Sequence, residues 1–192
     1  MSTHSLLATD RLMLRPPVTF DIPALIDACQ DPLVQRVISH DGEYTEADAE
    51  KYLASVIAGW QGATRYTWAI IPPAGVFAGQ VSLTRTSETE ATIGYWLAPE
   101  FRGQGILPEA AAALLDHALD PAGMNLTTIR WNAYAGNLAS AHVAQKLGFK
   151  YTETARIGTL HWNRQRDAWV AHLHRGEDRT PQMWPVLETV HA

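Results

Sequence analysis

The sequence predicts one domain of the α/β (α+β) class, residues 1–192, in which helices flank a mixed, mostly antiparallel twisted sheet of about six or seven strands. Three observations lead to this prediction. Apolar residues in the first third of the chain recur with helical spacing, those in residues 66–97 alternate with a period of two, and helical and strand patterns then take turns to residue 174. With 192 residues, 46% of them hydrophobic and 18% charged, the chain is long enough to bury one core.

The first expected elements are a short strand and two short helices. Residues 11–15 (RLMLR) alternate between polar and apolar side chains, as is typical of a half-buried strand, and a proline pair ends it. Asp21, with Pro23 in the first turn, predicts the start of a helix that Asp21 caps. Asp31-Pro32 predicts that a second helix begins there.

A longer helix and three strands follow. Thr45 and Asp48 have the spacing of a capping box, and the helix that they open should end near Gly62. Its apolar stripe consists of Tyr52, Leu53, Val56, Ile57 and Trp60. Alternating segments then predict an antiparallel hairpin and a third strand, at residues 66–71, 76–84 and 91–97.

In the second half of the chain, a glycine-rich turn at residues 102–105 leads into a helix rich in Ala and Leu. This helix should run to about Leu119, because Pro121 stops it. A strand, a helix ended by Gly148 and two further strands are then expected at residues 127–134, 138–147, from 149 onward and 167–174.

Composition excludes several classes of protein. The formal net charge of −5 and the lack of a run rich in Lys and Arg argue against nucleic acid as the main partner. The single Cys29, which we expect in the core, excludes an internal disulfide and a zinc site built of cysteines. No apolar run approaches the ~18 residues of a membrane span, and the start lacks a long apolar secretory stretch. We therefore expect a cytoplasmic protein without a membrane partner.

A metal site is not predicted either. His172 and His174 lie two residues apart on an expected strand and so share a face, but a third ligand with suitable spacing is not evident.

The turn Arg102-Gly103-Gln104-Gly105 stands between a strand and a helix, an arrangement that can cradle phosphate. Glycines let the backbone approach closely, and the free amides of a helix start carry partial positive charge. The pattern is not that of a dinucleotide-binding fold, because Pro108 stands where the third glycine is needed, and it lacks the lysine of a nucleoside-triphosphate loop. A tight turn without a ligand stays open as an alternative.

Two segments resemble the GNAT acyltransferase superfamily. Residues 102–107 (RGQGIL) resemble its Q/R-x-x-G-x-G/A signature, although Leu107 replaces the final Gly or Ala. Asn137-Leu138-Ala139-Ser140 and, downstream, residues 146–149 (KLGF) resemble its N-x-x-S and K-L-G-F stretches. Together with the opening strand, these segments resemble, in their order and spacing, the branch of the RimJ and RimL protein N-terminal acetyltransferases. The resemblance implies a GNAT-like fold, acetyl-CoA as cosubstrate and a primary amine, in a protein N-terminus or a small molecule, as acceptor.

The resemblance also implies the residues that hold acetyl-CoA. Pyrophosphate would be bound by the amides of Gly103, Gln104, Gly105, Ile106 and Leu107, with the charge of Arg102 beside them. Pro108 has no N–H group and gives no donor. The oxyanion donor would be the backbone N–H of Leu97 or Ala98, and Asn137, the expected helix cap, would contact the pantetheine arm.

For catalysis, the resemblance implies direct attack of the amine in a ternary complex. Ala144 stands where many members carry a Tyr acid, so Ser140 is the expected proton donor to the thiolate. Glu90 is the expected general base, with Glu88 as its competitor, and a solvated carboxylate is an equal alternative for either.

The acceptor pocket is expected between the N-terminal helices and the C-terminal strands. Its candidate residues are Tyr44, Trp60, Trp96, His161 and Trp162. Transfer of succinyl or a longer acyl group, and a catalytically weak CoA-binding sensor or interaction module, remain alternative functions. The chain could act as a monomer or a homodimer.

Overall fold

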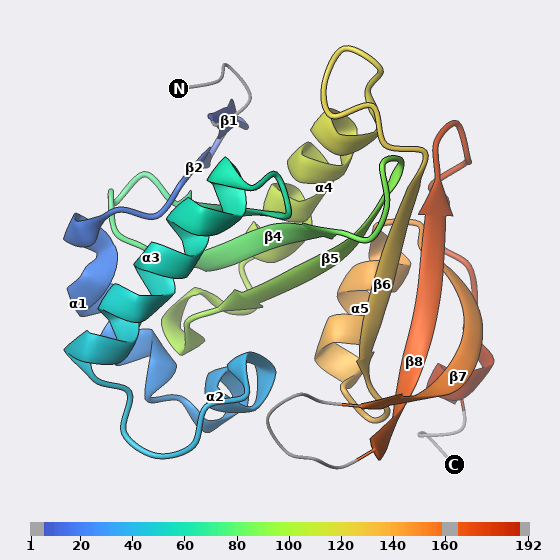
Figure 1. The fold of residues 1–192 in the computed structure, drawn as a ribbon. Coiled ribbons are helices and arrows are strands. Elements are labelled where there is room, and N and C mark those ends of the chain that lie inside the picture. Colours follow the sequence, from blue (N-terminus) through green and yellow to red (C-terminus); the bar gives the residue numbers. More distant parts are fainter. Residues whose placement is uncertain (1–5, 159–164, 189–192) are drawn as a thin grey trace. The chain divides into compact units, whose positions relative to one another are not determined.

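The computed structural model describes residues 6–158 and 165–188 (Figure 1). The chain divides into two compact units, the first formed by residues 1–85 and 94–116 and the second by residues 86–93 and 117–192. Strand β5 (Glu90–Leu97) and helix α4 (Ile106–Leu119) each run from one unit into the other.

The class predicted from the sequence is confirmed: helices flank a mixed, mostly antiparallel sheet. Within the described residues, eight strands are hydrogen-bonded in the order β1-β2-β3-β4-β5-β6-β8-β7, which is one or two more than the sequence predicted. The extra strand at the start is β1 (Leu7–Ala8), which pairs antiparallel with β2 (Met13–Arg15). With only two residues, β1 is too short to show an alternating pattern.

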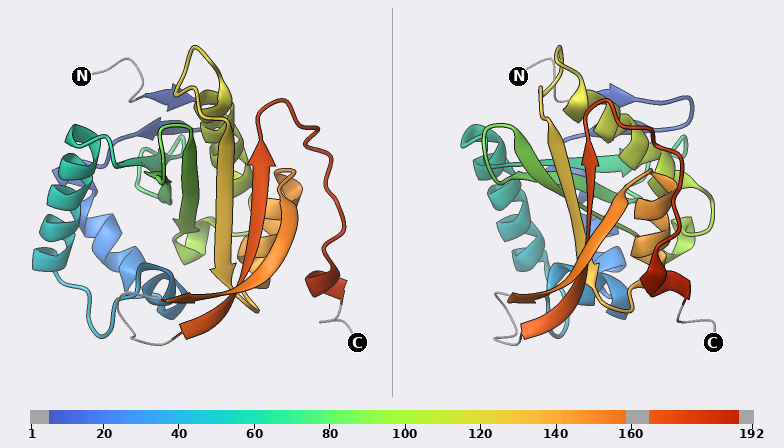
Figure 2. Two further views of the ribbon diagram at one scale, coloured as in Figure 1. Left: turned by 45° about the vertical axis from the view of Figure 1, so that its right-hand side comes forward. Right: turned by 90° about the vertical axis from the view of Figure 1, so that its right-hand side faces the viewer.

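In the first unit, β2, β3 (Arg65–Ile71) and β4 (Gly79–Arg85) form an antiparallel run. Helix α3 (Glu46–Gln61) lies on one face of these strands and α4 lies on the opposite face (Figures 1 and 2). The remaining helical elements of this unit are η2 (Thr19–Asp21), α1 (Ile22–Cys29), α2 (Pro32–Ile38) and η3 (Pro99–Phe101).

Local signals decide some helix starts of this unit and tertiary contacts decide others. The capping box of α3 is confirmed, because Thr45 Oγ1 accepts from the Asp48 N–H and Asp48 Oδ2 accepts from the Thr45 N–H. Asp21, however, does not cap α1. Its carboxylate is buried and accepts instead from the Arg15 guanidinium, at 2.7 and 2.8 Å. A bidentate ion pair with Arg is stronger than a cap, so it takes the carboxylate.

The core of the first unit lies between its helices and strands, and it includes Cys29, as predicted. Burial raises the pKa of the Cys29 thiol to about 12, so it stays protonated. The principal members of this core are Ile22, Leu25, Cys29, Val34, Tyr44, Leu53, Ile71, Phe77 and Trp96.

In the second unit, the first half of β5 pairs parallel with β6 (Thr128–Tyr134) over four positions, from Glu90↔Thr128 to Ile93↔Trp131. Strand β6 pairs antiparallel with β8 (Gln165–His174), which pairs antiparallel with β7 (Lys150–Gly158). Helix α5 (Leu138–Lys146) lies on one face of β6 (Figures 1 and 2). The short α6 (Pro185–Glu188) was not predicted.

None of the helices in the described part of the chain is both long and apolar enough to span a membrane.

Candidate active site

The glycine turn joins η3 to α4 in the first unit. Gly103 and Gly105 both have a φ of +74°, a conformation that glycine adopts without strain. A Cβ atom built on Gly103 would meet no atom within 4 Å, so open space lies beside this backbone. The first helical hydrogen bond runs from the Glu109 N–H to the Gly105 carbonyl, at 3.2 Å. The first amides of a helix have no partner within it, which makes this end of α4 able to bind an anion.

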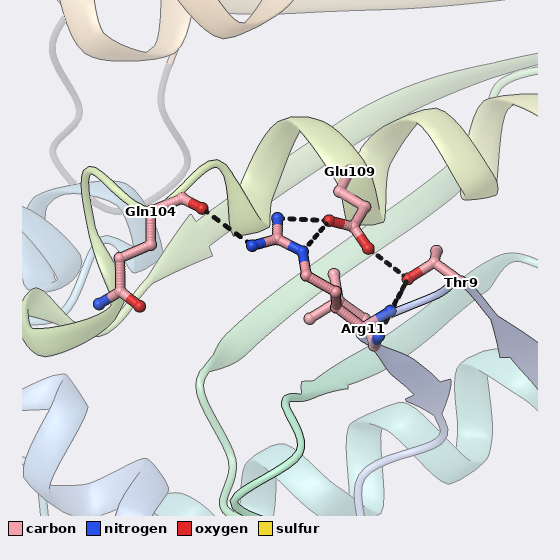
Figure 3. Close-up of polar contacts among 5 residues, drawn as sticks. Thr9, Arg11, Gln104 and Glu109 are labelled. Atoms are coloured by element: carbon pink, nitrogen blue, oxygen red, sulfur yellow. Dashed lines mark hydrogen bonds and ion pairs between the residues drawn. The ribbon is translucent and has the colours of Figure 1, made fainter.

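The guanidinium of Arg11, from the segment before β2, reaches this turn (Figure 3). Arg11 Nε donates to Glu109 Oε2 at 2.8 Å, and its Nη1 lies 3.5 Å from the Gln104 carbonyl oxygen. Thr9 Oγ1 donates to Glu109 Oε1 at 2.5 Å. Partial burial raises the pKa of Glu109, but the hydrogen bonds from Thr9 and Arg11 outweigh it and hold this pKa below its usual value. The carboxylate thus stays ionised and fixes Arg11 beside the turn.

We predict that Arg11→Gln weakens the binding of CoA by about 3- to 10-fold at ~50 mM salt. The substitution removes a positive charge near the phosphates and leaves the Glu109 carboxylate without its ion pair. Because salt screens the charge of Arg11, the weakening of CoA binding by Arg11→Gln should fall below about 2-fold at ~0.5 M salt. Titration calorimetry measures both values, with Arg65→Gln, at the start of β3, as a variant of equal net charge. Equal weakening at both salt concentrations would point to a distorted turn and not to lost charge.

Arg102, which the sequence placed beside the pyrophosphate, has other partners. Its Nη2 donates to Asp31 Oδ1 at 2.8 Å, and its Nε and Nη2 donate to the Leu97 carbonyl oxygen at 3.2 and 3.1 Å. Asp31 also caps α2, and the hydrogen bond from Arg102 is the largest of the effects that hold its pKa below the usual value. The guanidinium therefore ties α2 to the end of β5, a positioning role that the sequence did not predict.

The end of β5 narrows the choice of oxyanion donor. The Ala98 N–H already donates to the Ala78 carbonyl oxygen at 2.9 Å, so it is the less suitable of the two expected donors. The pairing of β5 with β6 stops at Ile93, and Leu97 lies four residues beyond that point. Leu97 therefore stays the candidate donor on this strand.

Ser140 and Asn137 lie in the second unit, at the start of α5. Asn137 Oδ1 accepts from the Ser140 N–H at 3.2 Å, which confirms Asn137 as the N-cap. The hydroxyl oxygen of Ser140 accepts from Trp131 Nε1 at 3.2 Å. Ser140 is half-buried, and two elements, α5 and β6, fix its position.

The position of Glu90 does not fit a general base that acts at Leu97. Glu90 is exposed and is the first residue of β5. Leu97 lies seven positions further along the strand, a distance of about 23 Å along the chain. Neither direct contact nor one bridging water spans this length, so the expectation for Glu90 is not supported.

The residues expected around the acceptor do not gather in one place. Tyr44 and Trp96, each 6% exposed, belong to the core of the first unit. Tyr44 precedes the start of α3, whereas Trp60 lies near its far end, about 21 Å from Glu46 by the rise of a helix. Trp60 donates its indole N–H to the Thr67 carbonyl oxygen. His161 and Trp162 lie outside the described residues.

Two observations bear on ligands of other kinds. The rings of His172 and His174 stack with centroids 6.2 Å apart, but no group of three or more metal-ligating side chains occurs within residues 6–158 and 165–188. The indole N–H of Trp96 is buried without a hydrogen-bond partner in the described structure, which is an unfavourable state for a polar group.

Residues 11–150 match the acetyltransferase (GNAT) domain family. The chain belongs to this family. The matched residues include the turn and Arg11 of the first unit and Asn137 and Ser140 of the second unit.

Individual proteins are similar to this GNAT chain over different lengths. YdaF of Bacillus subtilis (strain 168), whose name describes a ribosomal N-acetyltransferase, is 35% identical over 86 residues, which are 44% of this chain and 46% of YdaF. The match thus spans about half of that relative. A Salmonella typhimurium acetyltransferase that modifies the N-terminal serine of ribosomal protein L7/L12 has a TM-score of 0.77 at 21% identity, covering 88% of this chain and 98% of its own.

A further solved structure, the ribosomal L7/L12 α-N-protein acetyltransferase RimL in complex with coenzyme A, has a TM-score of 0.74 at 20% identity. It covers 90% of this chain and 99% of the RimL chain. At such identities the likeness to both structures shows a shared fold.

Sequence reasoning located the turn and the start of α5 in this GNAT chain but missed three residues around them. The alternation predicted a strand from residue 11, but Arg11 lies in a bend before β2, which begins at Met13. Its exposed position in that pattern was the available signal. Asp31 and Trp131 gave no signal, because their partners, Arg102 and Ser140, come from other elements.

Proposed function

We propose that this chain transfers the acetyl group of acetyl-CoA to an α-amino group, that of a protein or peptide. The observation that carries the proposal is the glycine turn at the start of α4, where two residues with positive φ and open space beside Gly103 occur in a GNAT domain. The names of the relatives, which describe acetylation of ribosomal proteins, support a protein N-terminus as the acceptor.

Acetyl-CoA is a substrate whose phosphates suit the residues of the turn. The amides of residues 103–107, at the positive end of α4, can donate to pyrophosphate oxygens. Arg11 adds positive charge at the same turn, since its guanidinium approaches the Gln104 carbonyl oxygen. The solved structure of RimL in complex with coenzyme A supports the same cosubstrate.

The reaction proposed is direct attack of a neutral amine on the thioester carbonyl carbon. The C–N bond forms, the carbonyl oxygen becomes an oxyanion that the Leu97 N–H stabilises, and the C–S bond then breaks. The thiolate receives a proton from the Ser140 hydroxyl, which regains one from water, and the surplus amine proton goes to solvent. A thiol with a pKa of about 8.5 is a fair leaving group, so a weak acid suffices.

An α-amino group suits a site in which the expected general base, Glu90, lies too far from Leu97 to deprotonate the amine. Its pKa of about 7.7–8.0 leaves a large neutral fraction at pH 8, whereas a lysine side chain with a pKa of about 10.4 is almost fully protonated there. This difference between the two amines also provides the means to test the acceptor class.

The test is a thiol-release assay with two matched peptides, followed by mass spectrometry. One peptide has a free N-terminus and no lysine, and the other has a blocked N-terminus and one lysine. We expect acetylation of the first, with a rate that rises to about pH 8 and then levels off. Modification of the lysine peptide alone, with a rate still rising toward pH 10, would contradict the proposed acceptor. Preference for succinyl-CoA, or CoA binding without turnover of any amine, would contradict the acetyl transfer itself.

A further inference from the structure

We propose that Trp131 is a positioning residue for the reaction, and that its indole N–H orients the Ser140 hydroxyl toward the departing thiolate. The inference rests on the proposed role of Ser140 as proton donor. It concerns a buried side chain that acts on the reaction through Ser140.

The geometry of the pair fixes the direction of its hydrogen bond. Trp131 Nε1 lies 3.2 Å from Ser140 Oγ. An indole N–H can only donate, so the serine oxygen accepts in this bond. A serine hydroxyl has one proton and two lone pairs. With one lone pair engaged by the indole, the hydroxyl proton is directed away from Trp131.

The indole itself is held firmly. Trp131 is 1% exposed, and it occupies the last position at which β6 pairs with β5, opposite Ile93. Its ring packs against that of Trp184, with centroids 5.4 Å apart and planes 54° apart. A side chain buried in this way has one orientation, so the N–H points at the same place whether or not substrate is bound.

Ser140 is fixed from a second direction. Its backbone N–H donates to Asn137 Oδ1 at 3.2 Å in the first turn of α5. The helix cap therefore fixes the backbone of Ser140, and the hydrogen bond from Trp131 on β6 fixes its side-chain oxygen. Catalytic groups held from two sides in this way need little reorganisation when the thiolate forms.

A purely structural role for the bond is the competing explanation, because a buried indole N–H needs an acceptor anyway. Trp184 provides a matched control from the same aromatic pair. It is also 1% exposed, and its Nε1 donates to the Phe149 carbonyl oxygen at 3.1 Å. Trp131→Phe and Trp184→Phe both delete one buried indole N–H, and both keep an aromatic ring.

The first experiment is a kinetic cycle of Trp131→Phe with Ser140→Ala. We expect Trp131→Phe to lower kcat about 10-fold, with the KM for acetyl-CoA changed less than about 2-fold, whereas Trp184→Phe lowers only the Tm. In the Ser140→Ala background, Trp131→Phe should change kcat less than about 2-fold. An equal loss in both backgrounds, no loss from Trp131→Phe, or no loss from Ser140→Ala would each overturn the proposal.

A second experiment does not depend on acetyl transfer, so it separates failure of this inference from failure of the proposed function. In a Ser140→Cys variant, the pKa of the introduced thiol is read from thiolate absorbance. Cys29 does not interfere below pH 10, because burial raises its pKa to about 12. Since donation to a thiolate favours the charged form, adding Trp131→Phe should raise the pKa of the introduced thiol by about 0.5–1, and adding Trp184→Phe should not. The same pKa with and without Trp131→Phe would show that the indole does not act on this position.

Discussion

Gly79→Ala is expected to lower the free energy of unfolding by about 3 kcal/mol or more and to lower kcat as well. A Cβ atom at Gly79 would lie 2.3 Å from the Trp96 carbonyl oxygen and 2.8 Å from the Leu97 Cα atom. Both neighbours are backbone, so the clash cannot be relieved by turning a side chain. The φ of +149° adds strain, because a residue with a side chain rarely adopts it.

The loss of kcat in Gly79→Ala follows from the identity of its neighbour. Leu97 carries the proposed oxyanion donor, and relief of the clash has to move this part of β5. Small misplacements of a catalytic group cost large factors in rate. Urea unfolding and kinetic assays check the two effects separately.

Gly75→Ala is the control for this prediction. Gly75 precedes the same strand and has a φ of +76°, but its Cβ would meet no atom within 4 Å. Gly75→Ala should lower the free energy of unfolding by about 1 kcal/mol, from the strain of a positive φ alone. If Gly79→Ala were no less stable than Gly75→Ala, the close approach of β4 to Leu97 would be wrong.

The parts of the fold that local sequence decides were predictable. The capping box of Thr45 and Asp48, and the Asn137 cap, depend on residues three apart in the chain, and both are present. The strand predicted at residues 76–84 begins instead at Gly79. Backbone contact with β5 sets that start, which no pattern within the strand reveals.

Contacts between distant segments were not predictable. The Asp21 carboxylate binds Arg15 and does not cap α1, and Arg102 binds Asp31 and the Leu97 carbonyl oxygen, partners that the sequence did not indicate. Each of these charged side chains can bind several kinds of partner, and the fold decides which partner lies within hydrogen-bond distance. The local sequence therefore indicated the position of the turn, but it could not indicate that the guanidinium of Arg11 lies beside it.

The abundance of tryptophan has a related explanation. Trp68, Trp131 and Trp184 are among the largest fully buried side chains of the described structure. Trp96 and Trp169 are also buried, so at least five of the seven indole rings of the chain lie away from solvent. The indole N–H of Trp184 donates to a backbone carbonyl oxygen and that of Trp68 has no partner in the described structure, whereas that of Trp131 donates to the hydroxyl group of Ser140, our proposed proton donor.

Gly103→Ala is expected to weaken CoA binding at least about 10-fold, with a loss of stability no larger than that of Gly75→Ala. Gly103 has a φ of +74° and, like Gly75, open space where a Cβ would stand. The two substitutions therefore cost the folded chain a similar strain. They differ in place, since the methyl group at residue 103 would occupy the space that we assign to pyrophosphate oxygens.

A comparison of two acyl donors tests this assignment at the level of the phosphates. S-acetylpantetheine carries the same thioester as acetyl-CoA but has no pyrophosphate. In Gly103→Ala, kcat/KM should fall at least about 10-fold with acetyl-CoA and less than about 2-fold with S-acetylpantetheine, because only the first donor contacts the turn. Gly75→Ala should leave both values near those of the unchanged chain. An equal fall with both donors would mean that the turn supports the fold near the acyl group, and phosphate binding would then have to be assigned elsewhere.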